Sequence, residues 1–456
     1  MSTMTALGHL VERAEPMGGP MAAPELTRSE IERDGAGALS PAFWARFHER
    51  YWEREAVVLR QPLARPLATA AEAFAALSHA GDRYRAGTRA AGLEFCIEHA
   101  NLLADVGRHL PGAGDPSIEA YSARVTRLLQ GARFGLVVDE LQGDDPDLWL
   151  RLREFVRGLY AVAGHPGEQA KAGMFLGNYE TTPFGVHRGR AGVLMFVVRG
   201  RKRILAWPDA YFQGKEDLTY RLDYGPYVKD AIVLEGEPGD VLYWPSDHWH
   251  IGEDIDGGVS MAISLTLFME PSVAPDLLRE VARLLEARMG PAHRAAAAAL
   301  QPGRRPSARG LTTSATRAVR ALRRVTADPR VERALVASRL NHVTGYAFST
   351  VPEPLDAAPL ADDDVVRGHR EHPVLWVERG DELVCSASGR AFVHDAHPDA
   401  IRLLRWVNSG RRRRVSRLLA AHASPDGPGA LTPADVRRLL DKLRSLRALE
   451  VGRRQA

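Results

Sequence analysis

Two histidine-bearing segments in the middle of the chain contain the residue types best suited to chemistry. Residues 184–189 read Phe-Gly-Val-His-Arg-Gly and place His187 just before an apolar run. Residues 238–250 read Pro-Gly-Asp-Val-Leu-Tyr-Trp-Pro-Ser-Asp-His-Trp-His and end at His250. Two histidines and one carboxylate on one face of an octahedron can hold non-haem iron and leave the opposite face open. His187 and His250 are therefore the candidate metal ligands.

The third ligand of such a site would stand at position 189. Residues i and i+2 of a strand point to the same side, so His-x-Asp directs an imidazole and a carboxylate at one metal. Here the residue two after His187 is Gly189, which cannot ligate a metal through a side chain. His187 and His250 lie 63 residues apart, which leaves room for several intervening strands. A barrel would bring the two histidines together.

Short β-rich segments surround both histidines. Gly, Pro and Asp separate them, and several short strands with turn signals between them predict a sandwich or barrel. The segments are residues 174–176, 192–198, 203–207, 231–234, 240–244 and 259–268. Before them, Ser40-Pro41 predicts a helix start, with Ser as N-cap and Pro in the first turn. The other predicted elements are a strand at 56–59, mostly helix over 70–130, a strand at 134–138 and an amphipathic helix at 148–162.

The remainder of the chain predicts helices and then a small α+β unit. Helices are expected at 275–289, where Gly290-Pro291 stops the first, and at 313–340, with a Pro/Gly/Arg linker at 301–310 between them. The later order of small strands and helices fits a winged helix. The strands are expected at 374–377, 382–386 and 391–394, and the helices at 398–408 and 432–448.

Composition indicates a globular protein. The 456 residues are 45% hydrophobic and 26% charged, and no run of about 18 apolar residues predicts a membrane helix. The first residues lack the charged start and apolar stretch of a signal peptide. Cys96 and Cys385 are the only cysteines, which excludes a disulfide framework. We therefore expect a cytoplasmic protein with no membrane partner.

Positive charge is concentrated at the C-terminal end. The net charge is only +3, yet residues 401–456 hold 14 Arg/Lys against 4 Asp/Glu, a local excess of +10. The run Arg411 to Arg414 within it is most often a solvated helix face. In a winged helix such a run could bind nucleic acid or an acidic peptide. Few aromatic residues are interleaved with it, which argues against binding of single-stranded nucleic acid. We favour the solvated face, so nucleic acid is not an expected partner.

Across residues 40–270 the chain resembles the JmjC-type or cupin-like iron(II)- and 2-oxoglutarate-dependent oxygenases, especially the bacterial ribosomal-protein hydroxylases. The resemblance rests on the order of the histidine segment, Gly200-Arg201-Lys202-Arg203 and the Pro-Gly-Asp to Trp-His segment. It implies iron(II) held by His187 and His250, with 2-oxoglutarate as co-substrate. Lys202, one of only five lysines, would form a salt bridge to the distal carboxylate of that co-substrate. Weaker implied contacts come from Ser264, Tyr179 and Thr182.

Gly189 departs from the family pattern, which has Asp or Glu there, and three readings stay open. The vacant position could take chloride, as in the iron/2-oxoglutarate halogenases that have Gly or Ala at this place. A nearby acid or water could substitute, with Glu180, Asp247, Glu253 and Asp254 as the candidate acids. The domain could also be an inactive, cupin-like peptide-binding module. Arg188 and Arg190 should point away from the metal side of a regular strand, whereas His248 shares the side of His250.

The resemblance completes the expected architecture and function. We predict a mainly β core of the double-stranded β-helix, jelly-roll or cupin type with flanking helices, then a helical segment and a winged-helix-like α+β domain. The expected activity is oxidation of an aliphatic C–H bond in a peptide or protein, by hydroxylation or halogenation. The predicted parts are a flexible tail at 1–27, the oxygenase-like domain at 28–270, a segment that pairs two protomers at 271–365, and the C-terminal domain at 366–456.

Overall fold

The structure is a computed structural model that describes most of the chain as two compact units. The described residues are 19–35, 37–89, 92–182, 184–213, 223–270, 277–278, 280–287, 319–423 and 431–452. Unit 1 comprises residues 1–141 and 172–266, and unit 2 comprises residues 142–171 and 267–456. The predicted stop at Gly290-Pro291 and the predicted linker at 301–310 lie outside the described residues.

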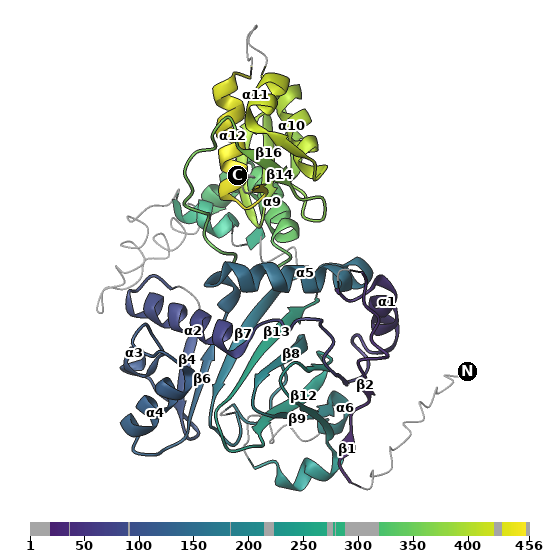
Figure 1. Cartoon of the computed structure of the whole chain (residues 1–456), viewed down its shortest axis with the longest axis vertical. Helices are drawn as coiled ribbons and strands as arrows, with labels where there is room; N and C mark the ends of the chain where they lie inside the picture. Colours follow the sequence, from purple (N-terminus) through teal and green to yellow (C-terminus); the bar gives the residue numbers. More distant parts are fainter. Residues whose placement is uncertain are drawn as a thin grey trace, which may run out of the picture. The chain divides into compact units, whose positions relative to one another are not determined.

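Two sheets form the centre of unit 1 (Figure 1). The smaller sheet consists of β1 (Met21–Ala22), β9 (Lys202–Pro208), β10 (Ile232–Gly236) and β12 (His248–Asp254). The larger sheet consists of β2 (Glu25–Leu26), β3 (Val57–Leu59), β4 (Leu93–Ile97), β5 (Ala100–Asn101), β6 (Phe134–Val138), β7 (Gln169–Gly177), β8 (Gly192–Arg199), β11 (Val241–Trp244) and β13 (Ser260–Phe268).

The chain alternates between these two sheets as it passes through the histidine segments. It runs from β8 in the larger sheet to β9 and β10 in the smaller, then to β11, back to β12, and finally to β13. Apolar side chains from both sheets pack together, including Val193, Met195 and Leu242 from the larger sheet and Ile204 and Leu234 from the smaller. Two packed sheets linked in this alternating way form the jelly-roll core that the sequence predicts.

Local sequence explains the first helix of unit 1. In α1 (Pro41–Arg50) the Ser40 hydroxyl accepts a hydrogen bond from the Phe43 amide at 3.0 Å, so the predicted N-cap is confirmed. The other helices are α2 (Ala70–Arg85), α3 (Val106–His109), α4 (Ile118–Leu128) and α6 (Asp209–Phe212), with a 3₁₀ turn at Gly225–Asp230. In Figure 1, α2, α3 and α4 gather beside β4 and β6.

One stretch of unit 1 differs from the mostly helical prediction for residues 70–130. Leu93–Ile97 forms β4, which pairs antiparallel with β6. A short apolar run does not distinguish a buried strand from a helix segment, so pairing with β6 decides its conformation. Part of the predicted flexible tail is also paired: β1 runs parallel to β10, and β2 runs parallel to β3.

Unit 2 contains helices and two three-stranded sheets. The strand orders are β18-β14-β19 and β15-β16-β17. The helices are α5 (Pro146–Ala163), α9 (Pro329–Thr344), α10 (Pro398–Asn408), α11 (Val415–His422) and α12 (Pro433–Ser445). The strands are β14 (Val365–Gly368), β15 (Leu375–Arg379), β16 (Glu382–Ala387), β17 (Arg390–Asp395), β18 (Arg412–Arg414) and β19 (Leu449–Val451).

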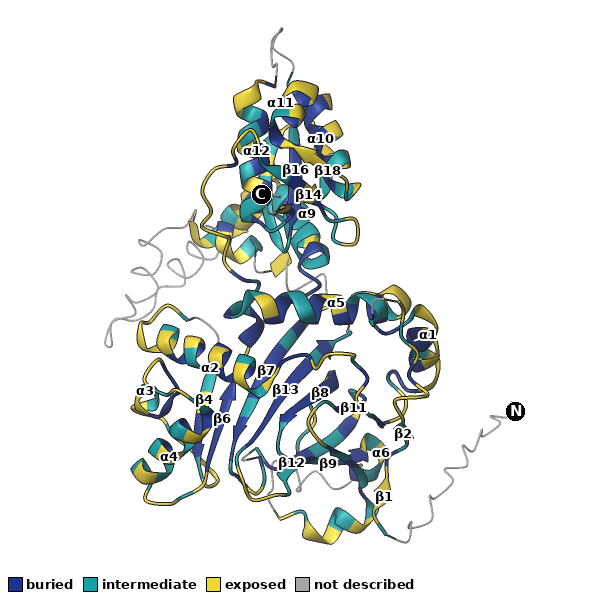
Figure 2. Ribbon diagram, in the orientation of Figure 1, coloured by how far each residue is buried: buried dark blue, intermediate teal, exposed yellow. Residues whose placement is uncertain are grey.

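The C-terminal part of unit 2 has a leucine-rich core. Leu403, Leu404, Leu418, Leu439 and Leu440 from α10, α11 and α12 are buried together, and Figure 2 shows the buried faces of these helices. The expected strands near 374–394 and helices near 398–448 are present, whereas the winged-helix assignment and the domain boundaries stay predictions. Within the described residues, no helix is long and apolar enough to span a membrane.

Candidate functional site

The two candidate metal ligands lie side by side. His250 is on β12, and His187 is in the segment between β7 and β8 that runs antiparallel beside β12. The His187 amide donates to the His250 carbonyl at 3.1 Å, and the His250 amide donates to the His187 carbonyl at 2.8 Å. Their imidazole ring centroids are 4.4 Å apart. The barrel therefore brings together two residues that are far apart in sequence.

Backbone carbonyls fix the orientation of both imidazoles. Nδ1 of His187 is 3.0 Å from the Gly185 carbonyl oxygen, and Nδ1 of His250 is 3.3 Å from the His248 carbonyl oxygen. When Nδ1 carries the proton and donates to a carbonyl, Nε2 presents a lone pair, which is the usual arrangement of a metal-binding histidine. Both side chains are prepared to ligate through Nε2.

Burial also keeps these imidazoles neutral. It lowers the pKa of His187, and burial together with the neighbouring His187 ring holds the pKa of His250 well below its usual range. A cation cannot bind a protonated imidazole nitrogen, so neutral rings bind a metal without first losing protons. The protonation states therefore suit a divalent cation near neutral pH.

A cavity of about 160 Å³ joins the histidines to the other predicted residues. His187, Gly189, Lys202, Tyr179, Thr182, Ser264 and His250 all line it. The rest of its wall is mostly apolar: Phe175, Phe184, Val193, Met195, Ile204, Trp244, Gly252 and Thr266. All seven residues predicted from the sequence thus meet at one cavity in unit 1. Mostly apolar walls with a few convergent polar groups are typical of a small-molecule site.

Lys202 supplies the one buried ammonium in this wall. It opens β9, is only 3% exposed, and its Nζ donates to the Tyr179 hydroxyl at 2.8 Å. The same ammonium lies 4.3 Å from the centroid of the Tyr179 ring. No carboxylate of the described residues forms a direct ion pair with it, although Asp254, opposite Lys202 in the β12–β9 pairing, interacts with it electrostatically. A buried ammonium that donates to a neutral hydroxyl favours binding of a carboxylate from a ligand.

The Tyr179 ring needs room that only glycine gives. A Cβ at Gly177 would stand 2.6 Å from Tyr179 Cδ1, and a Cβ at Gly135 would stand 3.2 Å from the same atom. Thr182 and Ser264 are buried and line the same cavity. Thr182 is bonded to β12, because its amide donates to the Gly252 carbonyl at 2.9 Å. The cavity wall therefore holds two further hydroxyl groups besides that of Tyr179.

Open space surrounds Gly189. It lines the cavity, and a Cβ built there would meet nothing within 4 Å. Close packing therefore does not require glycine at this position, and a side chain could start here without a clash. The space beside it is also open to a water molecule or a small anion.

The four candidate substitute acids have other positions. Glu180 pairs with Arg133 at 3.0 Å, and Asp247 is 2.7 Å from Nδ1 of His248. Glu253 pairs with Arg203, and Asp254 stands opposite Lys202 in the β12–β9 pairing. Burial raises the pKa of Asp254. Over the described part of the chain, no three His, Cys, Asp or Glu side chains gather closely enough to hold a metal.

Residues next to the ligands turn away from the cavity. The Arg188 guanidinium pairs with Asp209 at 2.5 Å and lies over the Trp249 ring, as the strand alternation predicts. The Trp249 indole also donates to Asp209. His248 is buried but does not line the cavity. Trp244 belongs to the hydrophobic core and also lines the cavity, and its ring centroid is 4.9 Å from that of His250.

Sequence reasoning missed several wall residues. Thr266 lies two after Ser264 on β13, so the alternation of a strand could have identified it once Ser264 was chosen. Gly252 lies two after His250 on β12 and could have been found in the same way. The remaining apolar residues, such as Met195, look like ordinary core positions in the sequence. Only the tertiary structure shows that they border a cavity.

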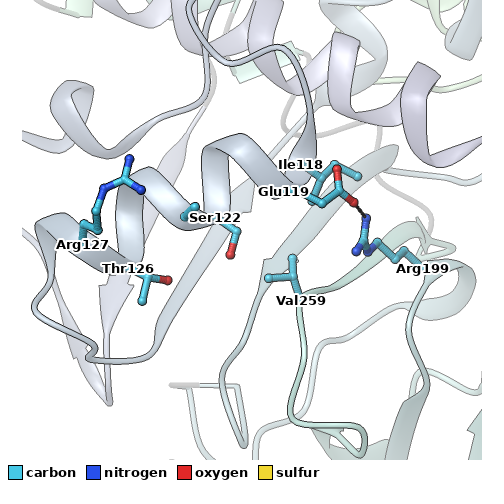
Figure 3. Close-up of a pocket in the computed structure, with 8 residues that line it drawn as sticks. Ile118, Glu119, Ser122, Thr126, Arg127, Arg199 and Val259 are labelled. Carbon is cyan, nitrogen blue, oxygen red and sulfur yellow. Dashed lines mark hydrogen bonds and ion pairs between the residues drawn. The ribbon is translucent and has the colours of Figure 1, made fainter.

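A second hollow, of about 460 Å³, lies along α4 and is unrelated to the histidines (Figure 3). In Figure 3, Glu119 and Arg199 point toward one another and form an ion pair, while Arg127 lies farther along the helix. None of the predicted site residues lines this hollow. It offers exposed polar groups but no buried ligand-binding side chain.

Comparison with known proteins finds only distant structural similarity. No protein-family model and no curated protein matches the sequence. The solved structures that match include ycfD of Escherichia coli, at 14% identity and a TM-score of 0.45, with 90% of this chain and 98% of that chain covered. The structure of YcfD, a ribosomal oxygenase from Escherichia coli, with cobalt and 2-oxoglutarate matches at 15% identity, a TM-score of 0.45 and the same coverage. Similarity at this level is too distant to assign a site or an activity to this chain.

Proposed function

We propose that this protein oxidises an aliphatic C–H bond with iron(II), 2-oxoglutarate and oxygen. The observation that carries the proposal is the meeting, in one cavity, of two Nε2-presenting histidines and one buried ammonium whose direct hydrogen-bond partner is a neutral hydroxyl. Iron(II) bound there with 2-oxoglutarate would supply the oxidising chemistry. The remaining roles belong to residues of this chain.

His187 and His250 would hold the metal at one end of the cavity. Their Nδ1–carbonyl contacts keep both rings in the tautomer that presents Nε2. Lys202 would bind the distal carboxylate of 2-oxoglutarate at the other end, with Tyr179, Thr182 and Ser264 placing hydroxyls around it. The apolar walls would exclude water, which strengthens each of these charged contacts.

We further propose that the position beside Gly189 decides the outcome of the reaction. The open space there has room for an ion in place of the carboxylate. If chloride binds there, chlorine would be transferred to the substrate carbon. If water binds there, the product would be hydroxylated. The cavity of this chain fits both anion and water, so halogenation and hydroxylation are the two outcomes to test.

The substrate class follows from the sequence resemblance, which implies a peptide or protein side chain.

Exposed apolar side chains in unit 2 support the proposed pairing of protomers through residues 271–365. There, Leu277, Leu278, Val319 and Leu322 are exposed. Exposed apolar side chains on helices favour contact with another protein surface. Sedimentation that shows a monomer at all accessible concentrations would contradict this part.

The decisive experiment measures co-substrate turnover and product mass. Protein is incubated with iron(II), 2-oxoglutarate, oxygen and a peptide library, with chloride present or absent. We expect succinate to form and a product mass to shift by either one oxygen or one chlorine with its isotope pattern. A protein that forms no succinate under any of these conditions would instead be an inactive peptide-binding module.

Two matched variants then test position 189. Gly189→Asp supplies a carboxylate next to the histidines, so it should suppress chlorination and favour hydroxylation. Gly189→Asn has nearly the same shape without the charge, so it should not restore hydroxylation. Chlorination that persists in Gly189→Asp would contradict the assignment of the halide to this position. Hydroxylated product alone, at saturating chloride, would leave an oxygenase.

A further inference from the structure

The arginine run at the C-terminal end lies on a strand and not on a helix face as expected from the sequence. Arg412–Arg414 forms β18, an edge strand that pairs antiparallel with β14. All three residues are exposed, as is Arg411 before them (Figure 2). Strand geometry therefore decides which arginine side chains lie on the same surface.

The pairing places several arginines on one face of this sheet. Arg412 and Arg414 are two residues apart and point to the same side, roughly 6.6 Å from each other along the strand. Arg367 on β14 stands directly opposite Arg412. At the turn into β18, the Arg367 Nε donates to the Gly410 carbonyl at 3.2 Å, and Arg370 packs beside Gly410. Arg411 immediately precedes β18 in the same turn. We call the arginines of this face and this turn, Arg367, Arg370, Arg411, Arg412 and Arg414, the basic ridge.

These five guanidinium groups have no carboxylate partners among the described residues. Other exposed arginines of the same unit do: Arg402 pairs with Asp399, Arg438 with Asp435 and Arg330 with Asp328. The acid that the strand pairing places beside the ridge is Glu450, which stands opposite Arg367 and is also 3.6 Å from Nε2 of His369. One carboxylate beside five guanidinium groups leaves the ridge with an excess of positive charge.

Protection of the sheet edge does not account for this arrangement. One or two charged residues are enough to discourage pairing at an edge strand of three residues. Like charges directly opposite each other, as at Arg367 and Arg412, destabilise a sheet. A bound anion would relieve this repulsion, so the arrangement suits binding of a polyanion.

We propose that the basic ridge binds the phosphate backbone of a nucleic-acid duplex. All five cations are arginines, whose planar forks donate paired hydrogen bonds to phosphate. The ridge contains no aromatic side chain on which an unstacked base could lie, which favours a duplex over a single strand. A three-residue edge offers few main-chain hydrogen bonds to an added peptide strand, which disfavours an acidic peptide.

The test is binding of the full chain to a labelled RNA duplex of about 20 base pairs, followed by anisotropy at several salt concentrations. Four or five phosphate contacts should give a slope of about −4 for the logarithm of the binding constant against that of salt. The triple variant Arg411→Gln, Arg412→Gln, Arg414→Gln should reduce the magnitude of this slope by about 3. It should also weaken duplex binding more than tenfold at low salt. The same measurement on a DNA duplex shows whether the affinity depends on the sugar of the nucleic acid.

The matched control removes three exposed arginines that already have carboxylate partners, by Arg402→Gln, Arg438→Gln and Arg330→Gln. It changes the net charge equally, so we expect binding within about twofold of the unaltered protein, because contact and not net charge carries the affinity. An equal loss in this control would overturn the proposal. So would absence of duplex binding at low salt, or displacement of the duplex by an equally charged polyglutamate. If the triple variant unfolds, the single change Arg412→Gln should still lower the slope by about 1.

Discussion

The chain uses positive charge in two opposite ways, in the cavity of unit 1 and on the basic ridge of unit 2. In the cavity, one lysine is almost completely buried and donates a hydrogen bond to a single hydroxyl. On the ridge, five arginines are exposed on two neighbouring strands and the turn beside them. A buried charge interacts strongly with a bound ion because water does not screen the interaction. An exposed charge interacts weakly with a bound ion, so affinity has to come from several exposed charges together.

The largest expected effect in this comparison is at the metal end of the cavity. The double change His187→Ala with His250→Ala removes both protein ligands, so stoichiometric iron binding should be lost completely. Metal analysis after dialysis measures it, with the exposed His79→Ala as the control that should retain iron. Unchanged iron content in the double variant would place the metal elsewhere.

The next effect is at the other end of the cavity. Lys202→Ala removes the ammonium that would face the distal carboxylate, so 2-oxoglutarate binding should weaken by about an order of magnitude or more. Calorimetry of the metal-loaded protein measures this loss. Lys442→Ala, an exposed lysine in unit 2, should leave the affinity unchanged. Equal affinity in Lys202→Ala and the unaltered protein would remove Lys202 from the site.

A smaller effect separates function from stability at the same residue. A buried ammonium that forms no direct ion pair opposes folding, whereas methionine has a similar length and no charge. Lys202→Met should therefore raise the unfolding free energy of the ligand-free protein by about 1 kcal/mol while it abolishes 2-oxoglutarate binding. Denaturant unfolding measures this change. A clear loss of stability would show that Lys202 is needed for the fold itself.

The smallest effect belongs to the ridge. Arg412→Gln alters one of several exposed charges, so duplex affinity should fall only about twofold to threefold near physiological salt. Its unfolding free energy should stay within about 0.5 kcal/mol of the unaltered protein, because no ion pair is lost. Duplex anisotropy and denaturant unfolding on one sample provide both numbers. A tenfold loss from this single change would mean that the ridge acts as a buried site and not as a set of independent contacts.

The sequence by itself determined the polar and metal-ligating candidates of the cavity, together with Gly189. His187, His250, Lys202, Tyr179, Thr182, Ser264 and Gly189 were selected from motif order and family resemblance, and all line it. Such motifs can be interpreted from the sequence because short-range rules govern them. Side chains alternate between the two faces of a strand, and a glycine turn ends the strand. Ser40 as the cap of α1 could be predicted for the same reason, since the bond spans only three residues.

Tertiary structure decided what those residues can do and where the arginine run lies. The four acids near the histidines were equal candidates in the sequence, yet three of them face residues far away in the chain: Glu180 pairs with Arg133, Glu253 pairs with Arg203, and Asp254 stands opposite Lys202. Four consecutive arginines have no periodicity of either strand or helix, so only pairing with β14 sets their conformation. The neutral state of His187 and His250 likewise comes from burial by distant segments. Contacts between residues far apart in the chain carry these properties, and a local pattern does not encode them.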